Sequence, residues 1–109
     1  MKWPKSVEIG GLKYRIKYVT PGKIHPIDGY KMLEKEESGA ITQATREIFI
    51  DKTLDPEVRL LVLFHEVFHG LGDVFRPNGP PFNREEFTNV VSNIVMQALK
   101  SMGMLPKLS

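Results

Sequence analysis

The sequence from Asp55 to Gly72, DPEVRLLVLFHEVFHGLG, predicts one long helix. Asp55-Pro56-Glu57 is a typical helix start, with a capping acceptor, a proline at the first helical position and an acid in the first turn. Gly70 and Gly72 predict the end of the helix. Because apolar residues lie on almost every side, we expect the helix to be buried between a sheet and a second helix.

This helix contains the pentad His65-Glu66-Val67-Phe68-His69, an H-E-x-x-H pattern that uses two of the three histidines of the chain. Four residues span just over one helical turn, so both imidazoles leave the same face and can share one metal ion. Glu66 then stands beside the ion, where it can take a proton from bound water. The alternative is a pair of core histidines, but it would leave Glu66 as a buried charge without a partner.

The first half of the chain has the pattern of a small sheet. Val7–Ile9 and Leu12–Val19 flank Gly10-Gly11, which predicts a tight hairpin. The second of these segments alternates apolar and basic residues with the period of a half-buried strand. Gly39–Thr42 and Glu47–Ile50 are predicted as two further short strands.

A second helix is predicted from about Asn83 to Lys100. Its apolar residues form one broad stripe, made of Phe87, Val90, Val91, Ile94, Val95 and Ala98. We expect Met96, Met102 and Met104 to pack rather than to form a site. Residues 23–38 leave more than one interpretation. The sequence favours a loop, and Tyr30–Glu37 can be either a short helix or an irregular strand. The pattern predicts an α+β fold, with a small antiparallel or mixed sheet of three to four strands packed on the central helix and a C-terminal helix.

Length and composition predict one domain over residues 1–109. The chain has no cysteine, so a metal would be held by histidine and carboxylate. The net charge of +2 is small and does not favour nucleic acid as a partner. The N-terminus has no secretory signal pattern, and the longest apolar run, Leu60–Phe64, is too short to cross a membrane. We therefore expect a cytoplasmic protein that does not bind membranes.

Two histidines do not complete a catalytic zinc site, which usually has three protein ligands and an open position. The metzincin pattern would place a third histidine at Phe75, which cannot bind metal. Asp73 is a conceivable ligand, although a solvated turn residue is the better interpretation. The third H-E-x-x-H class, the gluzincins, takes a glutamate from a second helix, and Glu85 and Glu86 stand at the start of the second helix predicted here.

We favour Glu85 over Glu86 as the third ligand. Asn83 suits the N-cap position, and Glu86 then falls three residues later, where a glutamate reaches back to the backbone of the cap. Phe82 and Phe87 fit the accompanying hydrophobic contact. Glu85 is left free, on the side of the helix that faces the seam with the first helix.

The pentad and the Glu85-x-x-x-Asn89 pattern together resemble a minimal gluzincin, similar to the ImmA/IrrE-like and phage-encoded metallopeptidases. The resemblance implies zinc held by His65, His69 and Glu85, and hydrolysis of a peptide bond by zinc-bound water with Glu66 as general base. It also implies that Glu47–Ile50 is the edge strand that binds an extended peptide.

Three further expectations accompany this resemblance. Asn89 replaces the aspartate of the family pattern, so it would support a ligand imidazole without a negative charge. His25, Tyr30 and Arg76 are candidates for stabilising the oxyanion. The partner would be a peptide or protein substrate. The alternative function is a zinc-stabilised module that binds a protein without cleaving it, and the sequence does not determine the substrate or the oligomeric state.

Overall fold

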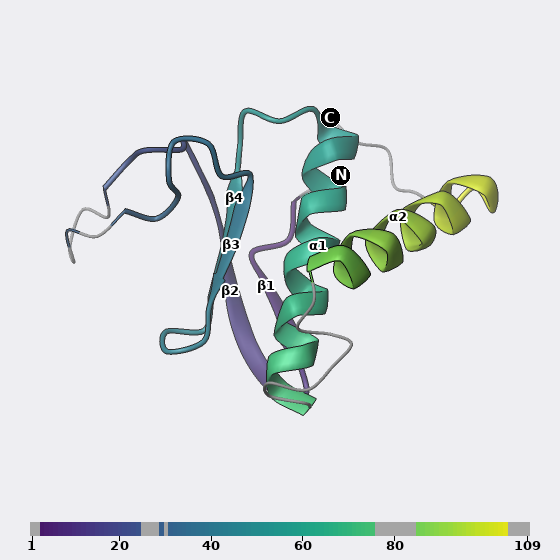
Figure 1. The fold of residues 1–109 in the computed structure, drawn as a ribbon, viewed down its shortest axis with the longest axis horizontal. Helices are drawn as coiled ribbons and strands as arrows, with labels where there is room; N and C mark the ends of the chain where they lie inside the picture. Colours follow the sequence, from purple (N-terminus) through teal and green to yellow (C-terminus); the bar gives the residue numbers. More distant parts are fainter. Residues whose placement is uncertain (1–2, 25–28, 30, 76–84, 105–109) are drawn as a thin grey trace.

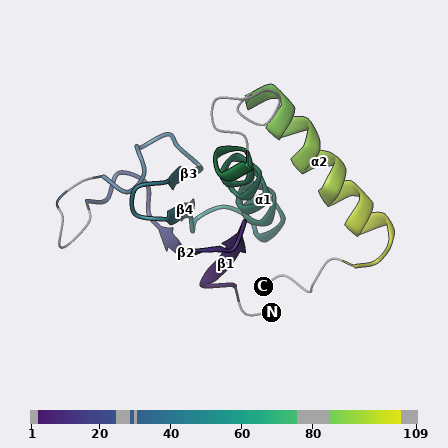
Figure 2. The same cartoon turned by 90° about the horizontal axis from the view of Figure 1, so that it is seen from below.

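The computed structural model describes residues 3–24, 29, 31–75 and 85–104, which form an α+β fold. Its elements, in chain order, are β1 (Ser6–Ile9), β2 (Leu12–Val19), β3 (Gly39–Thr42), β4 (Glu47–Asp51), α1 (Pro56–Phe75) and α2 (Glu85–Ser101). Helix α1 lies between the sheet on one side and α2 on the other (Figures 1 and 2). The predicted strands, the start of the first helix and its burial between two layers are confirmed.

The sheet is mixed and has the order β1-β2-β4-β3. β1 and β2 form the predicted antiparallel hairpin, β2 pairs with β4 in parallel, and β3 pairs with β4 in antiparallel fashion. The expectation that Glu47–Ile50 is an edge strand is wrong, because β4 has a partner on both sides. Sequence spacing does not show which strands pair across the long connection after β2, and here β3 takes the outer position.

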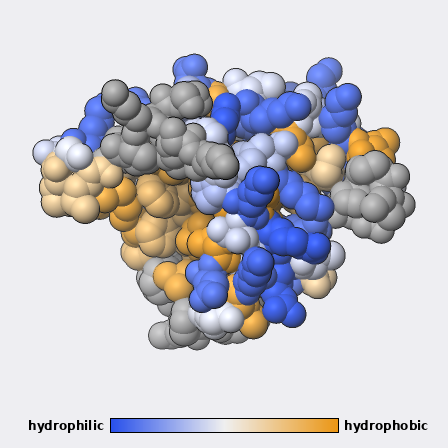
Figure 3. Space-filling model, turned by 180° about the vertical axis from the view of Figure 1, so that it is seen from behind, coloured by the Kyte–Doolittle hydropathy of each residue, from blue (hydrophilic) through white to orange (hydrophobic). Residues whose placement is uncertain are grey.

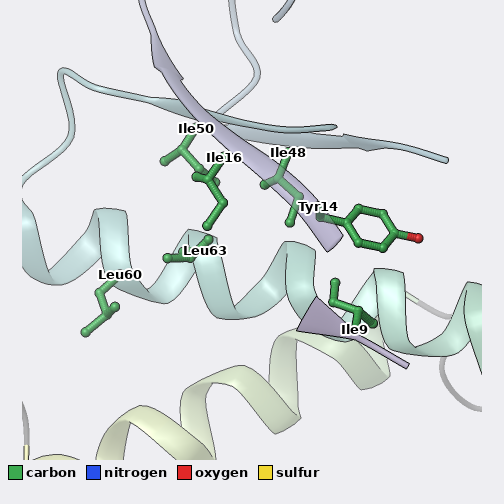
Figure 4. Packing of buried hydrophobic residues seen from close by; sticks show 7 residues of the cluster. All are labelled: Ile9, Tyr14, Ile16, Ile48, Ile50, Leu60 and Leu63. Carbon is green, nitrogen blue, oxygen red and sulfur yellow. The ribbon is translucent and has the colours of Figure 1, made fainter. Parts of the chain in front are cut away.

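The core lies between the sheet and α1. Ile16, Ile48 and Ile50 project from β2 and β4 toward α1, where they meet Leu63 (Figure 4). Tyr14 is completely buried in the same cluster, as its place in the alternating pattern of β2 predicted. This packing fixes α1 on the sheet along most of its length, so the residues of α1 that face the other way are available for a site.

Helix α1 runs through both predicted stop glycines and continues to Phe75, so the predicted end at Gly70 and Gly72 is wrong. A Cβ atom built on Gly70 would lie 2.8 Å from the terminal methyl groups of both Ile9 and Ile41. Gly70 therefore allows close contact between helix and sheet rather than ending the helix. Neither α1 nor α2 is long and apolar enough to cross a membrane.

Helix α2 packs on α1 with a different face from the one that its apolar stripe suggests. Its buried residues are Thr88 and Ser92, whereas Val90 and Ile94 are 53% and 58% exposed. On the face shown in Figure 3, hydrophobic surface gathers at the left, the side on which α2 lies. Met102 and Met104 are exposed as well, so the expectation that they pack is wrong for these two, while Met96 does pack against the core.

The segment between β2 and β3 contains neither a helix nor a regular strand among its described residues. Turns and a single isolated bridge between Ile24 and Lys31 organise it, and the backbone N–H of Gly22 donates to the carbonyl of Leu33. Leu33 is completely buried, which anchors the segment where it returns toward the sheet. Glu37 and Ser38 then lead directly into β3.

The first residue of β3 approaches α1 very closely. A Cβ atom on Gly39 would lie 2.6 Å from Cγ1 of Val62 and 3.1 Å from a carboxylate oxygen of Glu66. Valine is branched at Cβ and has little rotamer freedom in a helix, so it cannot easily move aside. Gly39 therefore sets how near the edge of the sheet comes to the pentad.

We predict that Gly39→Ala lowers the free energy of unfolding by about 1–3 kcal/mol, because the added methyl group overpacks the contact with Val62. Urea unfolding followed by circular dichroism measures this. Ser38→Ala is the matched control, since Ser38 is exposed and precedes the contact. Equal stability of the two variants would contradict the close approach.

Candidate functional site

Three side chains from two helices converge on one point. Nε2 of His65 lies 2.7 Å from Oε1 of Glu85, and Nε2 of His69 lies 2.7 Å from Oε2 of the same carboxylate. The two Nε2 atoms are 3.0 Å apart. The turn spacing of α1 places both imidazoles on one face, and the first turn of α2 supplies the carboxylate between them.

This group has the donor set and spacing of a zinc site. Two imidazole nitrogens and one carboxylate oxygen are common ligands of catalytic zinc, and three protein ligands leave a fourth position open. All three ligand atoms lie within 4.8 Å of one another. Ligand atoms about 2.0–2.2 Å from a tetrahedral zinc ion are about 3.3 Å apart, so the observed group needs to open by only a few tenths of an ångström.

The structure brings Glu85, and not Glu86, to the two histidines. Successive helical residues point about 100° apart, so only one of the two glutamates can face α1. Glu86 is exposed. The Glu85 side chain is itself 67% exposed, whereas His65 and His69 are mostly buried at 14% and 20%. The site is therefore open to solvent on the side of α2.

Glu66 is buried, with 6% of its surface exposed. Burial, and to a smaller extent the nearby charges of Glu85 and Glu37, together raise the pKa of its carboxyl from 4.5 to about 7. A carboxyl group in this range can both accept and return a proton near neutral pH. A general base needs this behaviour, and the role of Glu66 as a base stays a prediction.

A cavity of about 430 Å³ adjoins this group. The segment 37–39 before and at the start of β3 forms one wall, and facing residues of α1 and α2 form the others. His65, Glu66 and Glu85 all line it. A molecule in the cavity would therefore lie beside two of the three candidate metal ligands and beside Glu66 at the same time.

Several predicted site residues lie outside the described part of the chain: His25, Tyr30, Arg76, Phe82 and Asn83. The same holds for the side chains of Asp73 and Phe75. Among the described residues, Asn89 makes no hydrogen bond to either imidazole. It lines the cavity, and its backbone carbonyl accepts a bond from Nδ2 of Asn93. No hydrogen bond therefore supports the expected role of Asn89 in orienting a metal-binding imidazole.

Sequence reasoning missed Gly39, Glu37 and Ser92, all of which line the cavity. Glu37 and Gly39 lie in or next to a segment without periodicity, so no pattern marked them. Ser92 had a signal: it follows Glu85 and Asn89 at helical spacing, which places the three residues on one face of α2.

We predict that zinc binding depends on the three converging residues. His65→Ala, His69→Ala and Glu85→Ala should each weaken zinc binding by at least about tenfold, because each removes a ligand. Glu86→Ala is the matched control and should keep the affinity, with a stability loss on the order of 1 kcal/mol or less. Titration calorimetry with zinc measures both. A loss of affinity in Glu86→Ala but not in Glu85→Ala would reverse the assignment.

We also predict a pH dependence of stability that comes from Glu66, measured on zinc-free protein. Below about pH 4.5 both the folded and the unfolded chain carry the proton. As the pH rises toward 7, the unfolded chain loses its proton first, so ionisation favours unfolding. The unfolding free energy of wild type should fall relative to Glu66→Gln across this window, by on the order of 3 kcal/mol. A constant difference between pH 4 and 8 would contradict the raised pKa.

Comparison with known proteins finds no family model, no curated protein and no solved structure that matches this chain. Its function is therefore argued from its own residues.

Proposed function

We propose that this chain is a zinc-dependent metalloendopeptidase of the gluzincin type, in which His65, His69 and Glu85 hold the metal and Glu66 is the general base. One observation carries the proposal: a buried glutamate of raised pKa, Glu66, lines the same cavity as His65 and Glu85, two of the three residues of the His-His-Glu group. A zinc site that serves only the fold has no need of a carboxylate in this position, and it gains from a fourth protein ligand.

Zinc bound to such a group would polarise the substrate carbonyl and acidify water. Glu66 takes the proton from the attacking water, which its raised pKa permits near neutral pH, and it then passes the proton to the leaving amine. Because Glu66 on α1 is buried beside Gly39 at the start of β3, its carboxylate has little room to move before the substrate arrives. Pre-positioning of the base in this way lowers the entropy cost of the reaction.

The outer strand of the sheet suits the binding of an extended peptide. Among the strands that the structure describes, β3 pairs with β4 alone and lies at the end of the sheet. Its first residue, Gly39, reaches Glu66. A peptide that adds to the free edge of β3 by main-chain hydrogen bonds would pass beside the candidate base. We therefore propose β3 as the substrate-binding edge, in place of β4.

We predict that Glu66→Gln binds zinc and folds like wild type but hydrolyses flexible peptides at least about a hundredfold more slowly, because an amide cannot act as base. The measurement is cleavage of a broad peptide mixture followed by mass spectrometry. Glu86→Gln, an exposed glutamate beside the metal ligand, is the control that should keep full activity. Equal rates for Glu66→Gln and wild type would remove Glu66 from the mechanism. Zinc binding without any cleavage by wild type would favour the non-catalytic, protein-binding alternative.

A further inference from the structure

The cavity beside the metal group is acidic. Three carboxylates line it, those of Glu37, Glu66 and Glu85, and no lysine or arginine is among its described lining residues. Glu85 is a candidate metal ligand, and Glu66 is the proposed base that takes a proton from the attacking water. Glu37 is therefore the carboxylate that remains for another ligand. The backbone N–H of Glu34 donates to Oε1 of Glu37 at 2.7 Å, which holds this carboxylate in position.

A buried hydroxyl without a partner lines the same cavity. Ser92 is 1% exposed, and its Oγ has no hydrogen-bond partner among the described residues. Leaving a buried polar group unpaired is unfavourable, because the group loses its hydrogen bonds to water and gains none in return. Buried polar groups in proteins are generally paired, and an exception at a cavity wall is explained when a ligand supplies the partner.

A second acceptor accompanies this hydroxyl. Nδ2 of Asn93 donates to the backbone carbonyl of Asn89 at 2.8 Å, so one of the two N–H groups of this amide is used within the helix. Asn93 lines the cavity, and an amide side chain also carries an oxygen that can accept hydrogen bonds. Leu61 and Val62 supply apolar surface in the same cavity. Several acceptors, one of them charged, thus stand near an apolar wall.

We propose that this cavity is a subsite for a basic side chain, lysine or arginine, of the peptide substrate. Leu61 and Val62 pack against its alkyl stem, and Glu37, Ser92 and the side-chain oxygen of Asn93 accept hydrogen bonds from its cationic end. A long side chain with an apolar stem and several donors at its tip matches this lining. The inference rests on the proposed peptidase function, and it adds the class of residue that the site selects.

The test uses two matched sets of flexible alanine–glycine peptides. A single lysine is moved along the chain in one set, and norleucine, which has the same stem without the charge, replaces it in the other. Zinc-loaded wild type should cleave the best lysine peptide with a kcat/KM about tenfold or more above that of its norleucine counterpart. Equal values for the two sets would overturn the subsite while leaving the peptidase function intact.

A binding measurement distinguishes the proposal of a basic subsite from the proposal of peptidase activity. Fluorescently labelled peptides are titrated onto zinc-loaded Glu66→Gln, which cannot cleave them. The lysine peptide should bind at least about fivefold more tightly than its norleucine counterpart, within the range of a partly exposed ion pair. If wild type cleaves nothing but this preference is present, the peptidase function fails and the basic subsite stands. If neither peptide binds, or both bind equally, the subsite is wrong whether or not wild type cleaves peptides.

Three variants assign the preference to residues. Glu37→Gln and Ser92→Ala should each reduce the lysine-to-norleucine ratio by about threefold or more. Glu36→Gln, an exposed glutamate next in the chain to Glu37, is the control and should leave the ratio unchanged. Ser92→Ala should also keep or raise the Tm, because the hydroxyl has no hydrogen-bond partner in the described part of the chain. A clear fall in Tm would show that the hydroxyl serves packing instead, and an unchanged ratio in both variants would overturn the assignment.

Discussion

Helix α1 packs so closely on the sheet that, at two positions, there is no room for a side chain larger than that of glycine. Gly70 faces Ile9 and Ile41, and Gly39 faces Val62 and Glu66. Between these points the isoleucines of β2 and β4 fill the interface. Because the helix is fixed on the sheet, the rotation of α1 about its own axis is fixed as well. The pentad consequently presents its histidines toward α2 and keeps Glu66 at the edge of the sheet.

The site is formed where the sheet, α1 and α2 meet, and neither helix forms it alone. Sheet, α1 and α2 each contribute one wall of the cavity, and the candidate ligands come from the two helices. Burial of Glu66 follows from the closeness of β3, which excludes water from its carboxyl. The same closeness that packs the fold therefore raises the pKa on which the proposed chemistry depends. The close packing of β3 on α1 and the raised pKa of Glu66 therefore have one structural cause.

Periodic segments were predictable from the sequence, and contacts between distant segments were not. The alternation along β2 and the apolar run before His65 identify a strand and a buried helix, and the spacing of the pentad identifies two of the three converging residues. Glu85 followed from the capping pattern around it.

The order of the strands could not be predicted, because the pairing of β2 with β4 is non-local. Gly70 was misinterpreted, because close packing by Ile9 and Ile41 overrides its usual role at helix ends. The face that α2 buries was also missed, since small residues, Thr88 and Ser92, occupy the contact instead of the apolar stripe.

Helix α2 has contacts with α1 and none of comparable extent with the sheet. It is held at one end by Glu85 at the two histidines and at the other by the ion pair between Lys100 and Glu57, with small residues between. A metal ion shared by α1 and α2 would bind only when the helices are docked, so its binding free energy would add directly to the docking of α2. Under chelation, α2 would be the first cooperative unit to open, and its amide hydrogens would exchange ahead of those in the sheet. Metal supply would then set the lifetime of the docked helix as well as the reactivity of the site.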